Sequence, residues 1–176
     1  MELLDVKKQR CSSIQKKIDE CYEKIANKLF DFDMNYLKEK YNERIVKDNN
    51  TWILDNEIFI RKRTGNYQEG CFEIEDRRNT PFLWGFEYEL DNICIGDSFI
   101  FDNKPYCVSL LSSVTDSAML DEIDKLIGRL EESYEKLKYI LNNHYSELKF
   151  KYYDCHEEIY CESITEVIET VLKRKP

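Results

Sequence analysis

The chain has 176 residues, of which 35 are Asp or Glu and 26 are Lys or Arg, so its formal net charge is −9 at neutral pH. We expect one domain over residues 1–176, because this length is enough to bury a single hydrophobic core without a disulfide or metal staple. With only 5 Gly and 3 Pro, the composition excludes disordered and fibrous chains.

The N-terminal residues are charged and lack the apolar segment of a signal peptide, and the apolar run Phe82–Phe86 is too short to span a bilayer. We therefore expect a cytoplasmic protein with no membrane partner. The cysteines number 7 and lack the spacing of a disulfide framework, which predicts free thiols used as small apolar side chains.

The first predicted element is a long helix within residues 1–48, from about Leu4 to about Ile45. Turn-forming residues at positions 48–50 predict its end. Apolar residues recur every three or four positions and form one wide stripe, which we expect to face the core. The stripe consists of Ile14, Ile18, Cys21, Ile25, Leu29, Phe32 and Tyr36.

Between residues 51 and 112 the apolar period changes to two, which predicts an antiparallel β region. The predicted strands cover residues 51–54, 57–63, 71–76, 82–90, 93–95 with 98–101, and 106–111. The connections are too short for the crossover that parallel strands require, so we expect a meander.

A second long helix is predicted over residues 116–146, with Asp116 as its N-cap. Its apolar seam is broader than that of a two-stranded coiled coil. We expect the two long helices to pair antiparallel, either within one chain or between the chains of a homodimer. The predicted fold class is therefore α+β, with an antiparallel β-meander inserted between two long amphipathic helices.

Residues 147–176 form a predicted C-terminal appendage. Leu148, Phe150 and Tyr152 alternate with other residues, so this segment is either a strand whose hairpin partner is 158–162 or a continuation of the helix, and the sequence does not distinguish the two. Ser163 and Glu166 have the spacing of a capping box, which predicts a short final helix.

Thiol and imidazole side chains cluster at Cys155, His156 and Cys161. Zinc requires four ligands, and the paired spacing that marks a zinc site is absent, so we expect neither a metal nor a cofactor. Neighbouring carboxylates would also disfavour a nucleophilic thiolate. We assign no catalytic residue. The alternative is a small metal-dependent or thiol-using enzyme or nucleic-acid protein centred on these three residues.

The basic residues of 61–63 and 77–78 could gather into a local patch, but the acidic surplus of the chain disfavours direct nucleic-acid binding. We interpret these charges as solvated groups that protect strand edges. The carboxylates of the β region, among them Glu73, Glu75, Glu87 and Glu89, could instead imitate the phosphates of nucleic acid.

The sequence thus predicts a non-catalytic protein-binding module that regulates or inhibits a partner protein. Its more specific version is an inhibitor of a nucleic-acid-processing or defence enzyme, of phage or bacterial type. Exposed Trp, Tyr and Arg side chains dominate the binding energy of many interfaces. The predicted contact residues are Arg63, Tyr67, Trp84 and Tyr88, and Trp52 is assigned to the core.

Overall fold

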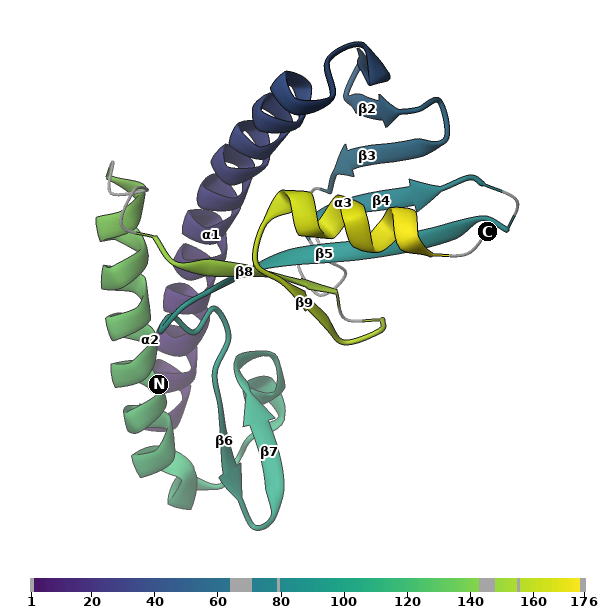
Figure 1. The fold of residues 1–176 in the computed structure, drawn as a ribbon. Coiled ribbons are helices and arrows are strands. Elements are labelled where there is room, and N and C mark those ends of the chain that lie inside the picture. The colour runs from purple at the N-terminus through teal and green to yellow at the C-terminus, as the bar shows by residue number, and fades with distance from the viewer. Residues whose placement is uncertain (1, 64–70, 79, 143–147, 155, 175–176) are drawn as a thin grey trace. The chain divides into compact units, whose positions relative to one another are not determined.

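The computed structural model of the chain describes residues 2–63, 71–78, 80–142, 148–154 and 156–174 (Figure 1). Two compact units can be distinguished: unit 1 comprises residues 1–25 and 92–148, and unit 2 comprises residues 26–91 and 149–176. The first helix, α1 (Leu3–Tyr41), contributes its N-terminal part to unit 1 and its C-terminal part to unit 2. The single domain expected from the chain length stays a prediction.

In unit 1, the N-terminal part of α1 packs against α2 (Leu120–Leu141), and the two run in the same direction (Figure 1). Lys7 forms an ion pair with Asp124 early in both helices, at 2.8 Å. Further along both helices, Lys17 lies over the ring of Tyr134. The predicted antiparallel orientation is therefore wrong. The long connection between the helices lets the chain return to the starting end of α1, which a short hairpin loop could not do.

The rest of unit 1 departs from the predicted meander. Strands β6 (Ser98–Phe101) and β7 (Lys104–Cys107) form a separate two-stranded sheet, and residues 93–95 are not a strand. The predicted last strand stops at Cys107, because residues 108–113 form the 3₁₀ helix η3.

Asp116 acts as a cap, as predicted, although it begins a 3₁₀ turn, η4 (Ser117–Met119), before α2. Its carboxylate accepts a hydrogen bond from the backbone N–H of Ala118 at 2.9 Å. Helix α2 ends at Leu141, earlier than the predicted end at residue 146. None of the described helices is long and apolar enough to cross a membrane.

Unit 2 is built on a seven-stranded antiparallel sheet with the order β1-β2-β3-β4-β5-β8-β9. The strands are β1 (Ile45–Asp48), β2 (Thr51–Leu54), β3 (Ile58–Lys62), β4 (Phe72–Asp76), β5 (Phe82–Leu90), β8 (Phe150–Asp154) and β9 (Ile159–Cys161). The first five strands form the meander, and the C-terminal hairpin pairs with β5. The hairpin interpretation of the C-terminal segment is confirmed, and the fold class is α+β.

The first strand was missed in the sequence. Helix α1 ends at Tyr41, and residues 45–48 form β1 instead of a last helical turn. The turn formers that follow close a two-residue hairpin in which Asp48 pairs with Thr51. Asn49 adopts a left-handed backbone conformation with φ of 54°, which Asn tolerates better than most residues.

The short helix α3 (Ile164–Lys173) belongs to unit 2. Ser163 accepts a hydrogen bond from the backbone N–H of Glu166 at 3.2 Å, which confirms its predicted capping role. The buried side of α3 consists of Ile164, Val167, Ile168 and Val171.

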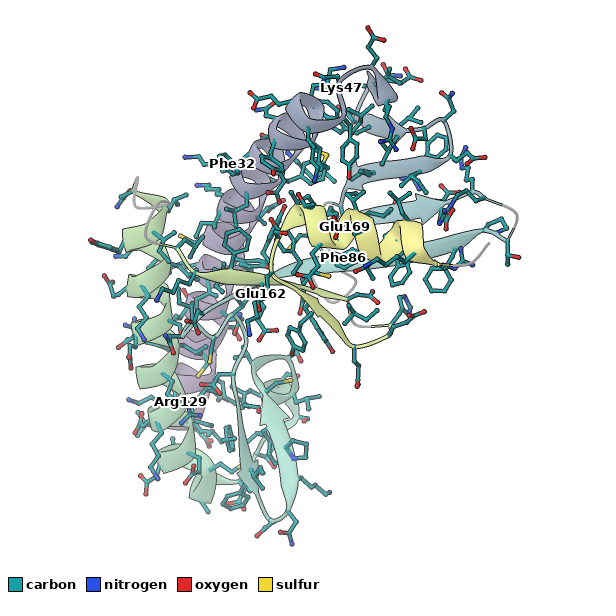
Figure 2. The ribbon with its side chains drawn as sticks, in the orientation of Figure 1. Phe32, Lys47, Phe86, Arg129, Glu162 and Glu169 are labelled. Carbon is teal, nitrogen blue, oxygen red and sulfur yellow. The ribbon has the colours of Figure 1, made fainter. Side chains whose placement is uncertain are left out.

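In the C-terminal part of α1, two residues of the predicted core stripe face outward. Phe32 is 69% exposed and Tyr36 is 46% exposed. Figure 2 shows Phe32 on the side of α1 that is away from the sheet. The positions next to them, Asp33 and Leu37, are buried instead. The expectation that Phe32 and Tyr36 face the core is therefore wrong, because the sheet of unit 2 meets a different side of the helix.

Candidate functional site

Side chains on the sheet of unit 2 alternate between two faces. On β5 and β8, the register pairs Tyr88 with Tyr152, and both side chains are buried. The register also pairs Glu87 with Tyr153, and strand geometry sends these two to the opposite face. This second face carries most of the charged side chains of the central strands.

On β3 and β4, arginine side chains neutralise the glutamates of the second face. Arg61 donates to Glu73 at 2.7 Å and to Glu75 at 2.8 Å. Arg63 also donates to Glu73 at 3.0 Å, and Arg77 donates to Glu75 at 2.9 Å. The hydrogen bonds from Arg77 and Arg61 lower the pKa of Glu75. We call these five residues the ion-pair cluster. It is neither a free basic patch nor a row of uncompensated carboxylates.

On β5, β8 and β9, the same surface has a different chemistry. The rings of Tyr153 and Tyr160 are in contact, with centroids 4.7 Å apart, and Tyr160 is 52% exposed. Two glutamates of β5 lie on this face, and the register pairs one of them with Tyr153 and the other with Lys151. We call this surface the acidic–aromatic face. It consists of Glu87, Glu89, Lys151, Tyr153, Tyr160 and Glu162.

The carboxylates of the acidic–aromatic face are poorly compensated. Burial raises the pKa of Glu87, and the negative charge of Glu89 raises it further. Lys151 forms a long ion pair with Glu162 at 4.0 Å. Within the described ranges, neither Glu87 nor Glu89 has an ion-pair partner, and Glu89 is compensated only by a hydrogen bond from the hydroxyl of Tyr160. The face therefore combines exposed aromatic surface with an excess of negative charge.

The contact residues predicted from the sequence do not come together. Trp84 and Tyr88 are 2% and 1% exposed, so the expectation that they reach the surface is wrong. Both fall on the buried face, where Trp84 pairs in register with Ile74. Arg63 lies in the ion-pair cluster, and Tyr67 lies outside the described residues.

Trp52 is half-buried rather than enclosed in the core. It lies on β2 and pairs in register with Lys47 of the outer strand β1. The ammonium group of Lys47 lies over the indole ring, 5.2 Å from its centroid. Trp52 is therefore flanked by a lysine on β1 and by the buried Ile60, its register partner on β3.

The thiol and imidazole cluster is only partly described. Cys161 is buried, and burial raises the pKa of its thiol. His156 is exposed, and Cys155 lies outside the described residues. No group of three or more His, Cys, Asp or Glu side chains that could hold a metal ion occurs in the part of the chain that the structure describes. Nothing in this geometry favours thiol chemistry at Cys161.

The sequence pointed to Glu87 and Glu89 as surface charges but missed Tyr153 and Tyr160. The signal was available, because residues 150–154 alternate and Tyr153 must lie opposite Tyr152 in a strand. No protein-family model matches the chain, and no curated protein or solved structure was found to resemble it. The function is therefore inferred from the chemistry of the acidic–aromatic face.

Proposed function

We propose that the protein is a non-catalytic binding module that regulates or inhibits a partner protein through the acidic–aromatic face. One observation carries the proposal. Carboxylates in two adjacent parts of the same sheet surface differ in their ion-pair partners. The glutamates of β4 are neutralised by Arg61, Arg63 and Arg77. Among the described residues, Glu87 and Glu89 of β5 have no arginine or lysine partner. Exposed aromatic side chains such as Tyr160 are enriched at binding surfaces, and charges around them favour association with a partner of opposite charge.

The chemistry of the face selects a basic partner surface. Guanidinium and ammonium groups bind carboxylates and also stack on tyrosine rings. The partner would therefore present Arg or Lys side chains to Glu87, Glu89 and the Tyr153–Tyr160 pair. Nucleic-acid-processing and defence enzymes carry such basic surfaces, which supports the more specific proposal of an inhibitor of such an enzyme. The same negative charge repels phosphate, so nucleic acid itself is a poor ligand.

The two tyrosines and the two glutamates should contribute differently. An aromatic anchor that becomes fully buried in an interface typically contributes about 2 kcal/mol or more on truncation. Charges at the rim mainly change the association rate and its dependence on salt. We therefore expect removal of the Tyr160 ring to increase the dissociation rate, and charge reversal at Glu87 and Glu89 to reduce the association rate.

The proposal is tested by affinity capture from lysate of the source cell with three immobilised proteins. These are the wild type, Glu87→Lys/Glu89→Lys, and Glu39→Lys/Glu43→Lys as a control with the same change in net charge at exposed positions. The proposal is supported if a protein binds to the wild type and to the control but not to the Glu87/Glu89 variant, and if nuclease treatment of the lysate does not change its binding. Equal retention by both variants would contradict it, as would loss of the partner after nuclease treatment.

A further inference from the structure

A buried carboxylate links α1 to the sheet of unit 2. Asp33 is 3% exposed, although it lies one position from the exposed Phe32. The hydroxyl of Tyr152 lies 2.9 Å from Oδ1 of Asp33 and 2.8 Å from Oδ2, and the hydroxyl of Tyr88 donates to Oδ2 at 3.0 Å. The helix and two neighbouring strands therefore meet at one carboxylate.

No cation compensates this carboxylate within the described residues. The ionisable groups that face it are Tyr88 from β5 and Tyr152 from β8, and Cys71, next to β4, lies near Tyr88. Lys62, which lies over the ring of Phe30, and Lys38 of α1 itself have other partners. Lys62 pairs with Asp31 at 3.2 Å, and Lys38 donates to the carbonyl of Ile45 at 2.9 Å.

The surroundings of the cluster are apolar and aromatic. The ring of Phe72 lies 5.6 Å from that of Tyr88 and 6.4 Å from that of Tyr152, measured between centroids. Phe30 of α1 contacts the same Phe72 ring at 5.7 Å. The ionised carboxylate of Asp33 loses its hydration in these surroundings. The hydrogen bonds from two neutral hydroxyl groups replace only part of the lost hydration free energy.

We propose that the Asp33–Tyr88–Tyr152 cluster is a proton-operated clamp, in which proton uptake by Asp33 strengthens the attachment of the C-terminal part of α1 to strands β5 and β8. In the protonated form the carboxyl group keeps its place between the two hydroxyls without the cost of a buried charge. In the ionised form the two hydrogen bonds persist, but the cost of burying the charge exceeds what they return, so the net attachment of α1 is weaker. The clamp does not depend on the proposed partner.

The direction of the effect follows from the proton affinities of the two states. Burial raises the pKa of Asp33 to about 6, although the hydrogen bonds from Tyr152 and Tyr88 lower it in part. An unfolded chain has an Asp pKa of about 3.9. Folding therefore takes up a proton between these two values. The unfolding equilibrium constant should fall by up to about 100-fold as the pH is lowered from above 6 to about 4, as far as Asp33 is concerned.

The clamp lies directly behind the acidic–aromatic face. Tyr88 is flanked in sequence by Glu87 and Glu89, and Tyr152 is flanked by Lys151 and Tyr153. Strand alternation sends the tyrosines to the buried face and these neighbours to the other face. Looser attachment of α1 above pH 6 would therefore loosen the two strands that present the acidic–aromatic face.

The proposal is tested by denaturant unfolding of the full chain between pH 7.5 and 5, together with amide protection factors for residues 26–41. For the wild type we expect a clear gain in stability and protection on acidification. Asp33→Asn should lose this pH dependence. Asp31→Asn, which changes an exposed carboxylate two positions away, should retain it. Glu87→Gln and Asp19→Asn serve to subtract the other two carboxylates whose pKa is raised.

A pH dependence that is identical in the wild type and Asp33→Asn would overturn the proposal. If Asp33→Asn does not fold, the wild type still provides a decisive measurement. The side-chain carboxyl carbon of Asp33 can be titrated by NMR in the folded chain, and we expect a midpoint near pH 6. A midpoint below pH 4.5 would overturn the clamp irrespective of any variant.

Discussion

Arg174 donates a hydrogen bond to Asp76 at 3.0 Å, although the two residues lie 98 positions apart in the chain. The same carboxylate accepts two hydrogen bonds from the guanidinium of Arg78, each at 3.0 Å. Arg78 also donates to the carbonyl of Val171, at 2.9 Å, where α3 ends. Asp76 is fully buried, so the end of β4 and the end of α3 are joined through one enclosed charge cluster.

Replacement of Asp76 by Asn should destabilise the fold strongly. The change leaves two guanidinium groups without their counter-charge, and breaking a buried ion pair in this way typically costs about 3–5 kcal/mol. Denaturant unfolding at pH 7 measures the loss. Asp55→Asn is the matched control, because Asp55 pairs with an exposed arginine, Arg44, and its loss should have little effect. Equal stability of the two variants would contradict the role of Asp76.

Asp76 should also make the protein sensitive to acid, in the sense opposite to Asp33. Burial alone would raise the pKa of Asp76, but the hydrogen bonds from Arg78 and Arg174 outweigh burial and lower the pKa. Its stabilising effect is therefore complete above the unfolded pKa of about 3.9 and is lost as the pH falls through the lower folded value. We therefore expect the free energy of unfolding to increase as the pH is lowered from 7 to 5, because of Asp33, and to decrease steeply below pH 4, because of Asp76.

The two tyrosines of the clamp should differ when each is changed to Phe. Tyr152 approaches both oxygens of Asp33, whereas Tyr88 contacts one. A hydrogen bond to a charged group contributes about 1.5–3 kcal/mol. We expect Tyr152→Phe to lose more stability than Tyr88→Phe at pH 7.5, and the difference to shrink at pH 5, where Asp33 is largely protonated. Unfolding at both pH values checks this, and a loss that does not change with pH would argue against it.

Truncation of Ser163 to Ala should cost about 1 kcal/mol, the usual effect of removing an N-cap side chain. Ser163→Asp should restore the stability, because a carboxylate can accept the same hydrogen bond from Glu166 and also interacts favourably with the helix dipole. Thermal unfolding of the three proteins provides the comparison. If the Asp variant is no more stable than the Ala variant, the cap does not act through this hydrogen bond.

The parallel orientation of α1 and α2 can be tested by carbodiimide cross-linking. This reagent joins an amine directly to a carboxylate with which it is in contact, and Lys7 lies 2.8 Å from Asp124. Mass spectrometry should identify a link between these two residues. Antiparallel helices would instead link Lys7 to Glu132 or Glu135 in the last turns of α2. Cross-linking a mixture of ¹⁴N- and ¹⁵N-labelled protein distinguishes links within one chain from links between two chains.

Local patterns determined much of the secondary structure. Alternating residues with turn formers on both sides were sufficient to predict β2 and β5 with their observed bounds. The capping box correctly marked the start of α3. The predictions failed where a tertiary contact overrides the local signal. Helical periodicity placed Phe32 and Tyr36 in the core, but the sheet contacts the side of α1 that carries Asp33 and Leu37.

The candidate site shows the same division. The glutamates of β5 could be identified from the sequence, because their alternation with apolar residues is regular. The sequence could not show that these glutamates lack the arginine partners that neutralise the glutamates of β4. It depends on which arginines reach which carboxylates, and therefore on the register of β3 with β4, where Arg61 pairs with Glu73. The clamp could not be predicted from the sequence either. An aspartate within a helix is normally solvated, and Asp33 is buried only because Tyr88 and Tyr152 cover it in the folded chain.

The two outer strands of the sheet limit aggregation. A sheet that does not close exposes unpaired backbone groups at its edges, and such edges can recruit strands from other copies. The outer strand β9 has only 3 residues, too few to form a long template. The other edge is β1, where the ammonium of Lys38 donates a hydrogen bond to the carbonyl of Ile45. Lys47 and Asp48 add charged side chains to the same strand. Neither edge of this seven-stranded sheet therefore offers a long template for pairing with a strand of another copy.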